Sequence, residues 1–146
     1  MKLVQLSLFL ENRPGQLKTP CQVLGRAGID ILSMSLADTQ QFGILRLIVE
    51  DWQKAKKVLE EAGCVVNVTE VLAVEVPDRP GGLGGVLDAF DQAGLSIEYV
   101  YALAAGHRAE TAVLIFRVED PDKAARLLEQ KGVRLLEREA VLARVS

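Results

Sequence analysis

The sequence predicts an α+β fold in which one strand–helix–strand–strand–helix–strand unit occurs twice, first in residues 1–70 and again in residues 71–146. Two observations support this prediction. A Pro-Gly loop that follows an alternating apolar strand and precedes a helical pattern is present in both halves, with Gly15 and Gly81 at equivalent positions. The strand and helix patterns around the loop also follow the same order in both halves. Because repetition of a whole set of elements indicates duplicated units, we expect two small domains of similar structure.

The first copy begins with a strand, a loop and a helix. Apolar residues alternate over residues 4–10, which is the period of a half-buried strand. From residue 17 the apolar positions are spaced for one helix face, and Gly28 is a candidate for the residue that ends this helix. Pro20 leaves two alternatives. Either the regular helix starts there with Thr19 as its N-cap, or the first turn is kinked.

The rest of the first copy supplies two strands, a second helix and a fourth strand. Residues 29–37 and 44–50 have the patterns of strands two and three, joined by a polar turn. The nearly continuous apolar run of the third strand is typical of the centre of a sheet. Asp51 is a candidate N-cap for a helix that Gly63 closes, and residues 64–68 give the fourth strand.

The second copy repeats each of these elements. The offset between the copies is 66 residues up to the turn between strands two and three and 69 after it, because this turn gains three residues. Asp120 followed by Pro121 predicts an N-cap with proline at the first helical position. Residues 141–145 match residues 72–76 at the same offset. We therefore predict that this tail is a strand that covers a sheet edge otherwise open to pairing with another chain.

Composition limits the classes of partner. The chain is 49% hydrophobic and 25% charged, with a formal net charge of −3, and neither half carries a basic stripe. This disfavours nucleic acid and anionic membrane surfaces as partners. Gln5 and Ser7 interrupt the first apolar run, which reads as a strand and not as a signal peptide, and no run reaches transmembrane length. We expect a cytoplasmic protein.

The residue types that commonly carry catalysis or bind metals are sparse. Cys21 and Cys64 lie in apolar patterns, and His107 is the only histidine. These residues form neither a zinc ligand set nor a disulfide framework, so we predict two small buried cysteines in a reducing compartment. No nucleophile and general base stand at a recognisable spacing. The sequence predicts no enzyme activity, no cofactor and no metal.

The repeated loop has the features of a binding position. Gly15 and Gly81 let backbone N–H groups approach a ligand, and the N-terminus of the helix that follows favours an anion. The side-chain oxygens of Asn12 and Asp78 can accept a hydrogen bond from an ammonium group. A free amino acid carries both charges, so the sequence predicts a site for a free amino acid at each loop.

These motifs resemble those of the ACT domain family. Residues 12–17 and 78–83 both match Asn/Asp-x-Pro-Gly-x-Leu, and residues 27–31 and 93–97 are similar to the family's Ala-Gly-Ile-Asn-Ile. The resemblance implies two ferredoxin-like ACT domains in tandem, each an antiparallel sheet with helices on one face. It also implies a regulatory protein that binds an amino acid at the interface of paired domains and acts on a separate enzyme of amino-acid metabolism.

The resemblance assigns three groups of ligand contacts. One polar side chain binds the amino group, the loop N–H groups bind the carboxylate, and a leucine lines the pocket; backbone at the start of strand two completes the site from the facing domain. These residues are Asn12, Gly15, Gln16, Leu17, Asp30 and Ile31 in the first copy and Asp78, Gly81, Gly82, Leu83, Ser96 and Ile97 in the second. The leucines favour an apolar or aromatic amino acid.

The two sites are not equivalent, and two other functions stay open. Asp78 adds a charge that Asn12 lacks, so we expect unequal binding. Arg13 and Arg79 follow the first strand of each copy, as an arginine does in acylphosphatases of the same topology, but no general base accompanies them. The third possibility is an oligomerisation subunit without a ligand. Halves of about 70 residues are marginal alone, so we expect them to share apolar surface with each other or with another chain, and we expect a homodimer.

Overall fold

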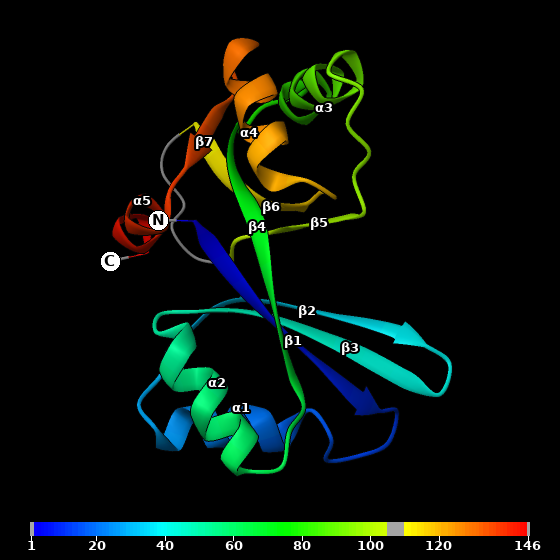
Figure 1. The fold of residues 1–146 in the computed structure, drawn as a ribbon, viewed down its shortest axis with the longest axis vertical. Helices are drawn as coiled ribbons and strands as arrows, with labels where there is room; N and C mark the ends of the chain where they lie inside the picture. Colours follow the sequence, from blue (N-terminus) through cyan, green and yellow to red (C-terminus); the bar gives the residue numbers. More distant parts are fainter. Residues whose placement is uncertain (1, 105–109, 146) are drawn as a thin grey trace. The chain divides into compact units, whose positions relative to one another are not determined.

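The structure, a computed structural model, describes residues 2–104 and 110–145 (Figure 1). His107 lies outside these residues. The chain forms two compact units. We call Val4–Thr69 the N-terminal unit, and Met1–Leu3 together with Glu70–Ser146 the C-terminal unit. Within the described residues, no helix has the length and apolar character needed to cross a lipid bilayer.

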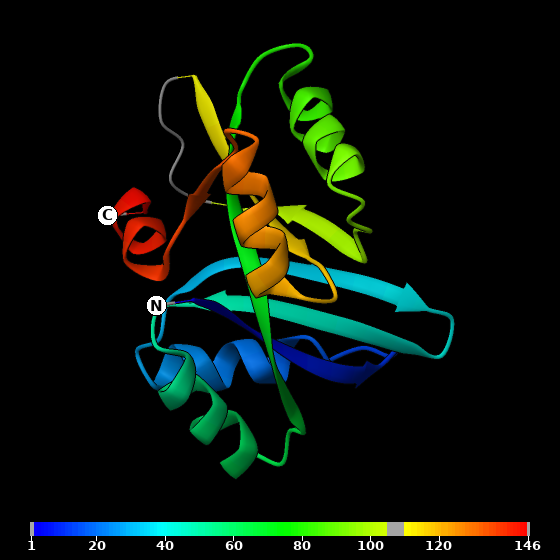
Figure 2. The ribbon, with the colours of Figure 1, turned by 45° about the horizontal axis from the view of Figure 1, so that its top comes forward.

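The N-terminal unit is a four-stranded sheet with two helices on one face. Its strands lie in the order β2-β3-β1-β4, and α1 and α2 pack together beneath them (Figures 1 and 2). The elements are β1 (Leu3–Glu11), α1 (Lys18–Arg26), β2 (Ile31–Thr39), β3 (Phe42–Val49), α2 (Trp52–Glu61) and the beginning of β4 (Val66–Pro77).

The alternation along β1 explains how this unit packs. Leu6, Leu8 and Leu10 are buried, and they form a core with Leu24 of α1 and Leu59 of α2. The intervening positions point to the other face of the sheet, where the side chain of Phe9 is largely exposed. β3 lies between β2 and β1, as its apolar sequence predicts. A period of two therefore fixes which side of the sheet the helices cover.

The C-terminal unit repeats this topology. Its strands lie in the order β7-β4-β6-β5, and α3 and α4 cover one face. Phe90 of α3 stacks on Phe116 of β6, with ring centroids 4.6 Å apart, at the centre of the core. The elements are β4, α3 (Gly82–Gln92), β5 (Tyr99–Ala102), β6 (Thr111–Arg117), α4 (Pro121–Gln130), β7 (Arg134–Leu136) and α5 (Arg138–Arg144).

Both units have the strand order 4-1-3-2 of a ferredoxin-like fold, counted within each copy, which confirms the predicted fold class. The two copies share a strand. β4 runs for 12 residues without a break and serves as the fourth strand of the first copy and the first strand of the second. Residues 64–68 and 72–76, read from the sequence as separate strands, therefore contribute to one element, which begins at Val66.

The prediction that residues 141–145 form a strand is wrong. These residues belong to α5 and its C-cap, and the edge of β4 is covered by β7, which pairs Arg134 with Glu75 and Leu136 with Ala73. The segment from Arg138 is rich in strong helix formers, and Val141 provides its buried contact. Residues 141–145 resemble residues 72–76 in apolar composition, but their own local sequence favours a helix.

The ends of the helices follow the predictions in part. Asp51 and Asp120 cap α2 and α4 as expected. α1, however, begins at Lys18 with Leu17 as its N-cap, so Thr19 is not the N-cap and Pro20 stands inside the first turn. Proline is tolerated there because the first N–H groups of a helix have no intrahelical acceptor.

The two cysteines are less buried than predicted. Cys21 and Cys64 are both free thiols of intermediate exposure. Cys64 packs against the edge of the N-terminal core, and partial burial raises the pKa of its thiol.

Candidate functional site

The two Pro-Gly loops have the same backbone construction. Asn12 N–H donates to the carbonyl oxygen of Gln41 at 3.0 Å, and Asp78 N–H donates to that of Glu110 at 2.7 Å. Gln41 and Glu110 are separated by the repeat offset of 69 residues. Each loop is therefore tied to the turn between strands two and three of its own unit, which holds it in a fixed position.

Gly15 and Gly81 have the backbone conformation that requires glycine. Their φ angles are +88° and +84°. A Cβ atom added at either position would meet nothing within 4 Å in the described part of the chain. The glycines are therefore needed for the left-handed turn and not to relieve crowding, and the space that a side chain would enter is open to a ligand.

The helices that follow the two loops begin without a side-chain cap. No described side chain caps α1 or α3, whose N-caps are Leu17 and Gly81. In contrast, Asp51 and Asp120 accept hydrogen bonds from the backbone N–H groups of Lys54 and Lys123, each at 3.2 Å, at the second helix of each copy. Part of each first turn is nevertheless engaged, because Thr19 N–H donates to the Gly15 carbonyl oxygen at 3.4 Å and Gly82 N–H to that of Arg79 at 2.9 Å. The N–H groups left for an external anion are those of Lys18 in α1 and of Leu83 and Gly84 in α3, and the helix dipole favours an anion there.

The polar residue of the first loop is partly engaged. Asn12 Nδ2 donates to the carbonyl oxygen of Gln40 at 3.1 Å and approaches Asp38 Oδ1 at 3.5 Å. These contacts orient the carboxamide, so Oδ1 of Asn12 is the atom that could accept from an ammonium group. Asp78 is exposed at the equivalent place.

A hollow beside the first loop brings several predicted residues together. It measures about 260 Å³, and Asn12, Gln16 and Leu17 line it. The hairpin of β2 and β3 closes the other side with Leu36 and Gly43. We call this the loop hollow. The hairpin residues were missed from the sequence, because their place beside the loop depends on strand register.

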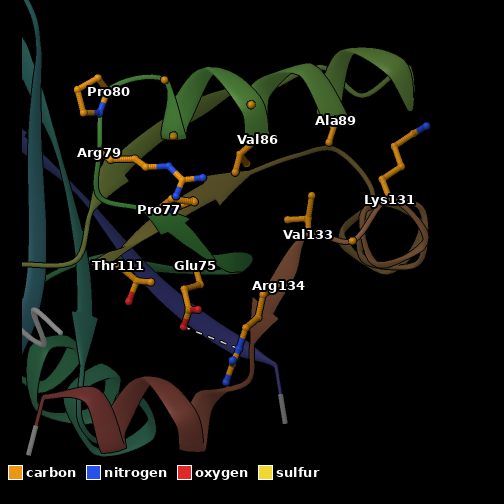
Figure 3. Close-up of a pocket in the computed structure, with 14 residues that line it drawn as sticks. Glu75, Pro77, Arg79, Pro80, Val86, Ala89, Thr111, Lys131, Val133 and Arg134 are labelled. Atoms are coloured by element: carbon orange, nitrogen blue, oxygen red, sulfur yellow. Dashed lines mark ion pairs between the residues drawn. The ribbon is translucent and has the colours of Figure 1, made fainter. Parts of the chain in front are cut away.

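Each unit also has a hollow between the start of its first helix and the start of its fourth strand. The N-terminal edge hollow, of about 470 Å³, is lined by Gln16 and Gly63 among others. The C-terminal edge hollow, of about 540 Å³, is lined by Gly81 and Gly82 together with Gly132 (Figure 3). Of the predicted residues of the second copy, only these two loop glycines line it.

The strand-two residues of the predicted sites lie elsewhere in their units. Ile31 pairs with Val49, whereas Glu11, next to the first loop, pairs with Phe42. These positions are seven residues apart on β3, which corresponds to roughly 23 Å. Asp30 and Ile31 are therefore at the opposite end of their own sheet. Their contact with a ligand held by a facing domain stays a prediction.

The second copy shows the same separation. Ser96 and Ile97 precede β5, whose first residue, Tyr99, pairs with Arg117 at the end of β6 that is remote from the second loop. Leu83 is exposed and does not line the C-terminal edge hollow. The role of these residues as ligand contacts likewise stays a prediction.

The described residues do not meet the requirements of a metal site. Over residues 2–104 and 110–145, no three His, Cys, Asp or Glu side chains are grouped so that they could hold a metal ion. Arg13, one of the two loop arginines, forms an exposed ion pair with Glu11 at 2.9 Å.

Duplicated ferredoxin-like units, each with a Pro-Gly loop before its first helix, define a tandem βαββαβ protein. The sequence profile described as an ACT domain pair matches residues 1–144. The chain therefore belongs to the ACT domain family, as an ACT domain pair.

Solved structures agree with this assignment. Protein BT0572 from Bacteroides thetaiotaomicron is similar with a TM-score of 0.88 and 36% identity, over 97% of this chain and 96% of that one. The aspartate kinase regulatory subunits from Thermus thermophilus and Thermus flavus have TM-scores of 0.64 and 0.61 at 17% and 18% identity. The two matches cover 88% and 89% of this chain, and 91% and 92% of the regulatory subunits. At such low identity they show the fold alone. No curated protein matches the chain.

Proposed function

We propose that this ACT domain pair is a cytoplasmic sensor that binds a free amino acid at its Pro-Gly loops and regulates a separate enzyme. The observation that carries the proposal is the contrast in helix capping. The second helix of each copy has an aspartate cap, whereas the helix after each loop begins without a side-chain cap. An α-carboxylate fits such a position, because it supplies the acceptor and the charge that a capping aspartate would supply.

The chemistry of the loop hollow supports an apolar amino acid as ligand. Leu10, Leu17 and Leu36 contribute apolar surface, and Oδ1 of Asn12 lies at the loop to accept from the ammonium group. A ligand with an apolar side chain would bury it against these leucines while its charged end remained at the loop. The two copies would differ in affinity, because Asp78 carries a charge at the position of Asn12.

The same residues support a regulatory role without catalysis. The described residues offer no nucleophile and base in hydrogen-bonding reach at either loop, and both loop arginines are exposed. We propose that binding alters contacts with another chain. Exposed apolar side chains on β1, β2 and β3, which include Phe9, Leu36 and Phe42, support a homodimer or an enzyme partner.

The test is a thermal-shift panel of the twenty amino acids on the full chain. A ligand at about 100 times its dissociation constant stabilises the folded state by roughly 2.7 kcal/mol, which raises the melting temperature by about 5–10 °C. The decisive variant is Gly15→Ala. Its matched control is Gly28→Ala, because Gly28 also has a positive φ, of +71°, and also meets nothing within 4 Å.

Both variants should lose stability through backbone strain, but only Gly15→Ala should lose the response to the ligand at the first loop. An equal response in both variants would show that the ligand binds elsewhere. A panel in which no amino acid at millimolar concentration raises the melting temperature would refute the proposed function.

A further inference from the structure

The edge hollows of the two units are built from equivalent positions of the repeat. Gln16 and Gly82 begin the wall on the helix side, and Gly63 and Gly132 stand at the start of the opposite wall. Each pair is separated by the repeat offset, 66 residues before the hairpin and 69 after it. The two hollows therefore share a backbone frame, and they differ in the side chains that line it.

Charged residues replace apolar ones in the C-terminal edge hollow. Glu75 stands where the N-terminal unit has Phe9, and Arg134 stands where it has Val65. The sheet register confirms the first equivalence, because Phe9 pairs with Ile44 and Glu75 pairs with Val113, which is 69 residues further on. Lys131, at the position of Ala62 in the first copy, also lines the charged hollow.

The negative charge in this hollow is already matched. Glu75 Oε2 accepts a hydrogen bond from Arg144 Nη1 at 3.0 Å, and the two side chains are only 17% and 12% exposed. Arg144 Nη2 donates to the Thr111 hydroxyl at 3.0 Å and to its carbonyl oxygen at 3.3 Å. Arg144 is thus fixed behind the hollow and compensates Glu75 from there.

The remaining charges in the hollow are positive. Arg134 Nε is 3.8 Å from Glu75 Oε2, longer than a hydrogen bond, and its side chain is 72% exposed. Lys131 Nζ has a neutral partner, Gln92 Oε1, at 3.5 Å. Arg79 forms no ion pair or side-chain hydrogen bond with any residue that the structure describes. Figure 3 shows Arg79 reaching in below the first turn of α3, while Arg134 lies beside Glu75 at the other end.

We propose that the C-terminal edge hollow binds a small organic dianion with two carboxylate groups. Arg79, together with the uncapped first turn of α3, receives one carboxylate, and Arg134 receives the other, while Lys131 adds positive charge at the rim near Gln92. Guanidinium groups suit this role because their paired N–H donors match the two oxygens of a carboxylate. Placing the cations at two ends of a hollow of about 540 Å³ favours a molecule with two separated charges over a single compact anion.

This site shares the first turn of α3 with the amino-acid site proposed at the second loop, and it is separate from the site proposed at the first loop. The first-loop site uses other side chains, since it lies in the N-terminal unit. Acidic amino acids have the required two carboxylates, and Glu75 could in addition accept from their ammonium group. Dicarboxylates without an amino group share the chemistry on which the inference rests.

The test is calorimetric titration of the full chain with succinate, L-aspartate, acetate and inorganic phosphate at constant ionic strength. Succinate or L-aspartate should bind with a dissociation constant at or below millimolar concentration, and acetate should bind at least tenfold more weakly. The main variant is Arg134→Val, which installs the residue of the first copy on an exposed strand position. Lys131→Ala does the same three residues earlier in the chain. Arg126→Val, which changes an exposed arginine of α4 outside the hollow, is the charge-matched control.

Arg134→Val should weaken dicarboxylate binding at least tenfold, and Arg126→Val should leave it unchanged. Binding of L-aspartate alone would support the site with Glu75 as the ammonium acceptor. Phosphate binding as tight as succinate would indicate an adventitious ion only and would overturn the proposal. So would the absence of dicarboxylate binding, or binding that survives both Arg134→Val and Lys131→Ala. The Gly15→Ala response to amino acids does not enter this result, so either proposal can fail alone.

Discussion

Arg144→Met should destabilise the C-terminal unit by about 2–3 kcal/mol. The guanidinium makes one ion pair with Glu75 and two hydrogen bonds with Thr111, all between 3.0 and 3.3 Å. Methionine keeps the helix propensity and part of the apolar stem, so the variant removes the charge contacts selectively.

The magnitude follows from the burial of the pair. Breaking a fully buried ion pair costs roughly 3–5 kcal/mol, and hydrogen bonds to charged groups contribute about 1.5–3 kcal/mol each. Glu75 and Arg144 retain 17% and 12% of their exposure, and Arg134 remains near Glu75, so the loss should fall below the range for full burial. α5 has only seven residues, too few to be stable alone, and Arg144 and the buried Val141 help to hold it in place.

Urea unfolding measures the overall loss, and amide hydrogen exchange over residues 138–145 locates it. Arg126→Met, on an exposed face of α4, is the control and should change the free energy of unfolding by less than about 0.5 kcal/mol. The double-mutant cycle with Glu75→Gln should give a coupling of about 1–2 kcal/mol. Equal unfolding free energies for Arg144→Met and Arg126→Met, or unchanged exchange in α5, would show that the contacts of Arg144 do not hold the helix.

Three further predictions concern single positions. Gly82→Ala should lower the free energy of unfolding by more than about 3 kcal/mol or prevent folding, because the added Cβ would lie 2.0 Å from the carbonyl oxygen of Pro77. Its control is Gly84→Ala, whose Cβ meets nothing within 4 Å of the described chain, and which should raise the free energy of unfolding in urea by about 0.5–1 kcal/mol. Removing either helix cap, by Asp51→Ala or Asp120→Ala, should cost about 1 kcal/mol in the same assay. Burial raises the pKa of the Cys64 thiol above the ordinary value of 9.0, so the thiol keeps its proton more tightly in the folded state than in the unfolded state. The resulting contribution to stability is complete below pH 9 and is lost as the pH rises further. The fall in unfolding free energy between pH 8 and pH 10.5 should therefore be smaller for Cys64→Ser.

The duplicated topology could be read from the sequence because its signals are local and occur twice. The alternation before Asn12, the capping residues Asp51 and Asp120, and the glycines at helix ends each act within a few residues. Errors arose where two local signals competed. At Pro20 the sequence allowed either the start of the helix or a kinked first turn. In the structure α1 begins two residues earlier, at Lys18, and Pro20 lies within its first turn.

The candidate site was predictable only in its backbone. The positive φ angles of Gly15 and Gly81 follow from the Pro-Gly motif, and the open helix starts follow from the lack of a capping residue. The lining residues Leu36 and Arg134 could not be placed in the same way. They reach the hollows through the pairing of strands far apart in the sequence, and this register is set by the whole sheet.

A signal for the charged hollow was nevertheless present in the repeat. Comparison of the copies position by position shows Glu75 against Phe9 and Arg134 against Val65, a change from apolar to charged at two lining positions. Changes of this kind in an otherwise preserved repeat indicate altered chemistry on a common frame. They are more informative than the conserved pattern itself, which reports the fold.

The C-terminal unit can carry a charged hollow because α5 has no counterpart in the first copy. At the offset of 69 residues, residues 138–144 stand where the first copy has residues 69–75, which belong to β4. The same repeat position is thus a strand in one copy and a helix in the other, and the equivalent residues Glu75 and Arg144 pair with each other. A glutamate at the position of Phe9 would lack this arginine, since residues 69–75 of the first copy belong to β4 and not to a helix. The arginine that compensates Glu75 therefore comes from α5, which the topology of the pair places in the C-terminal unit.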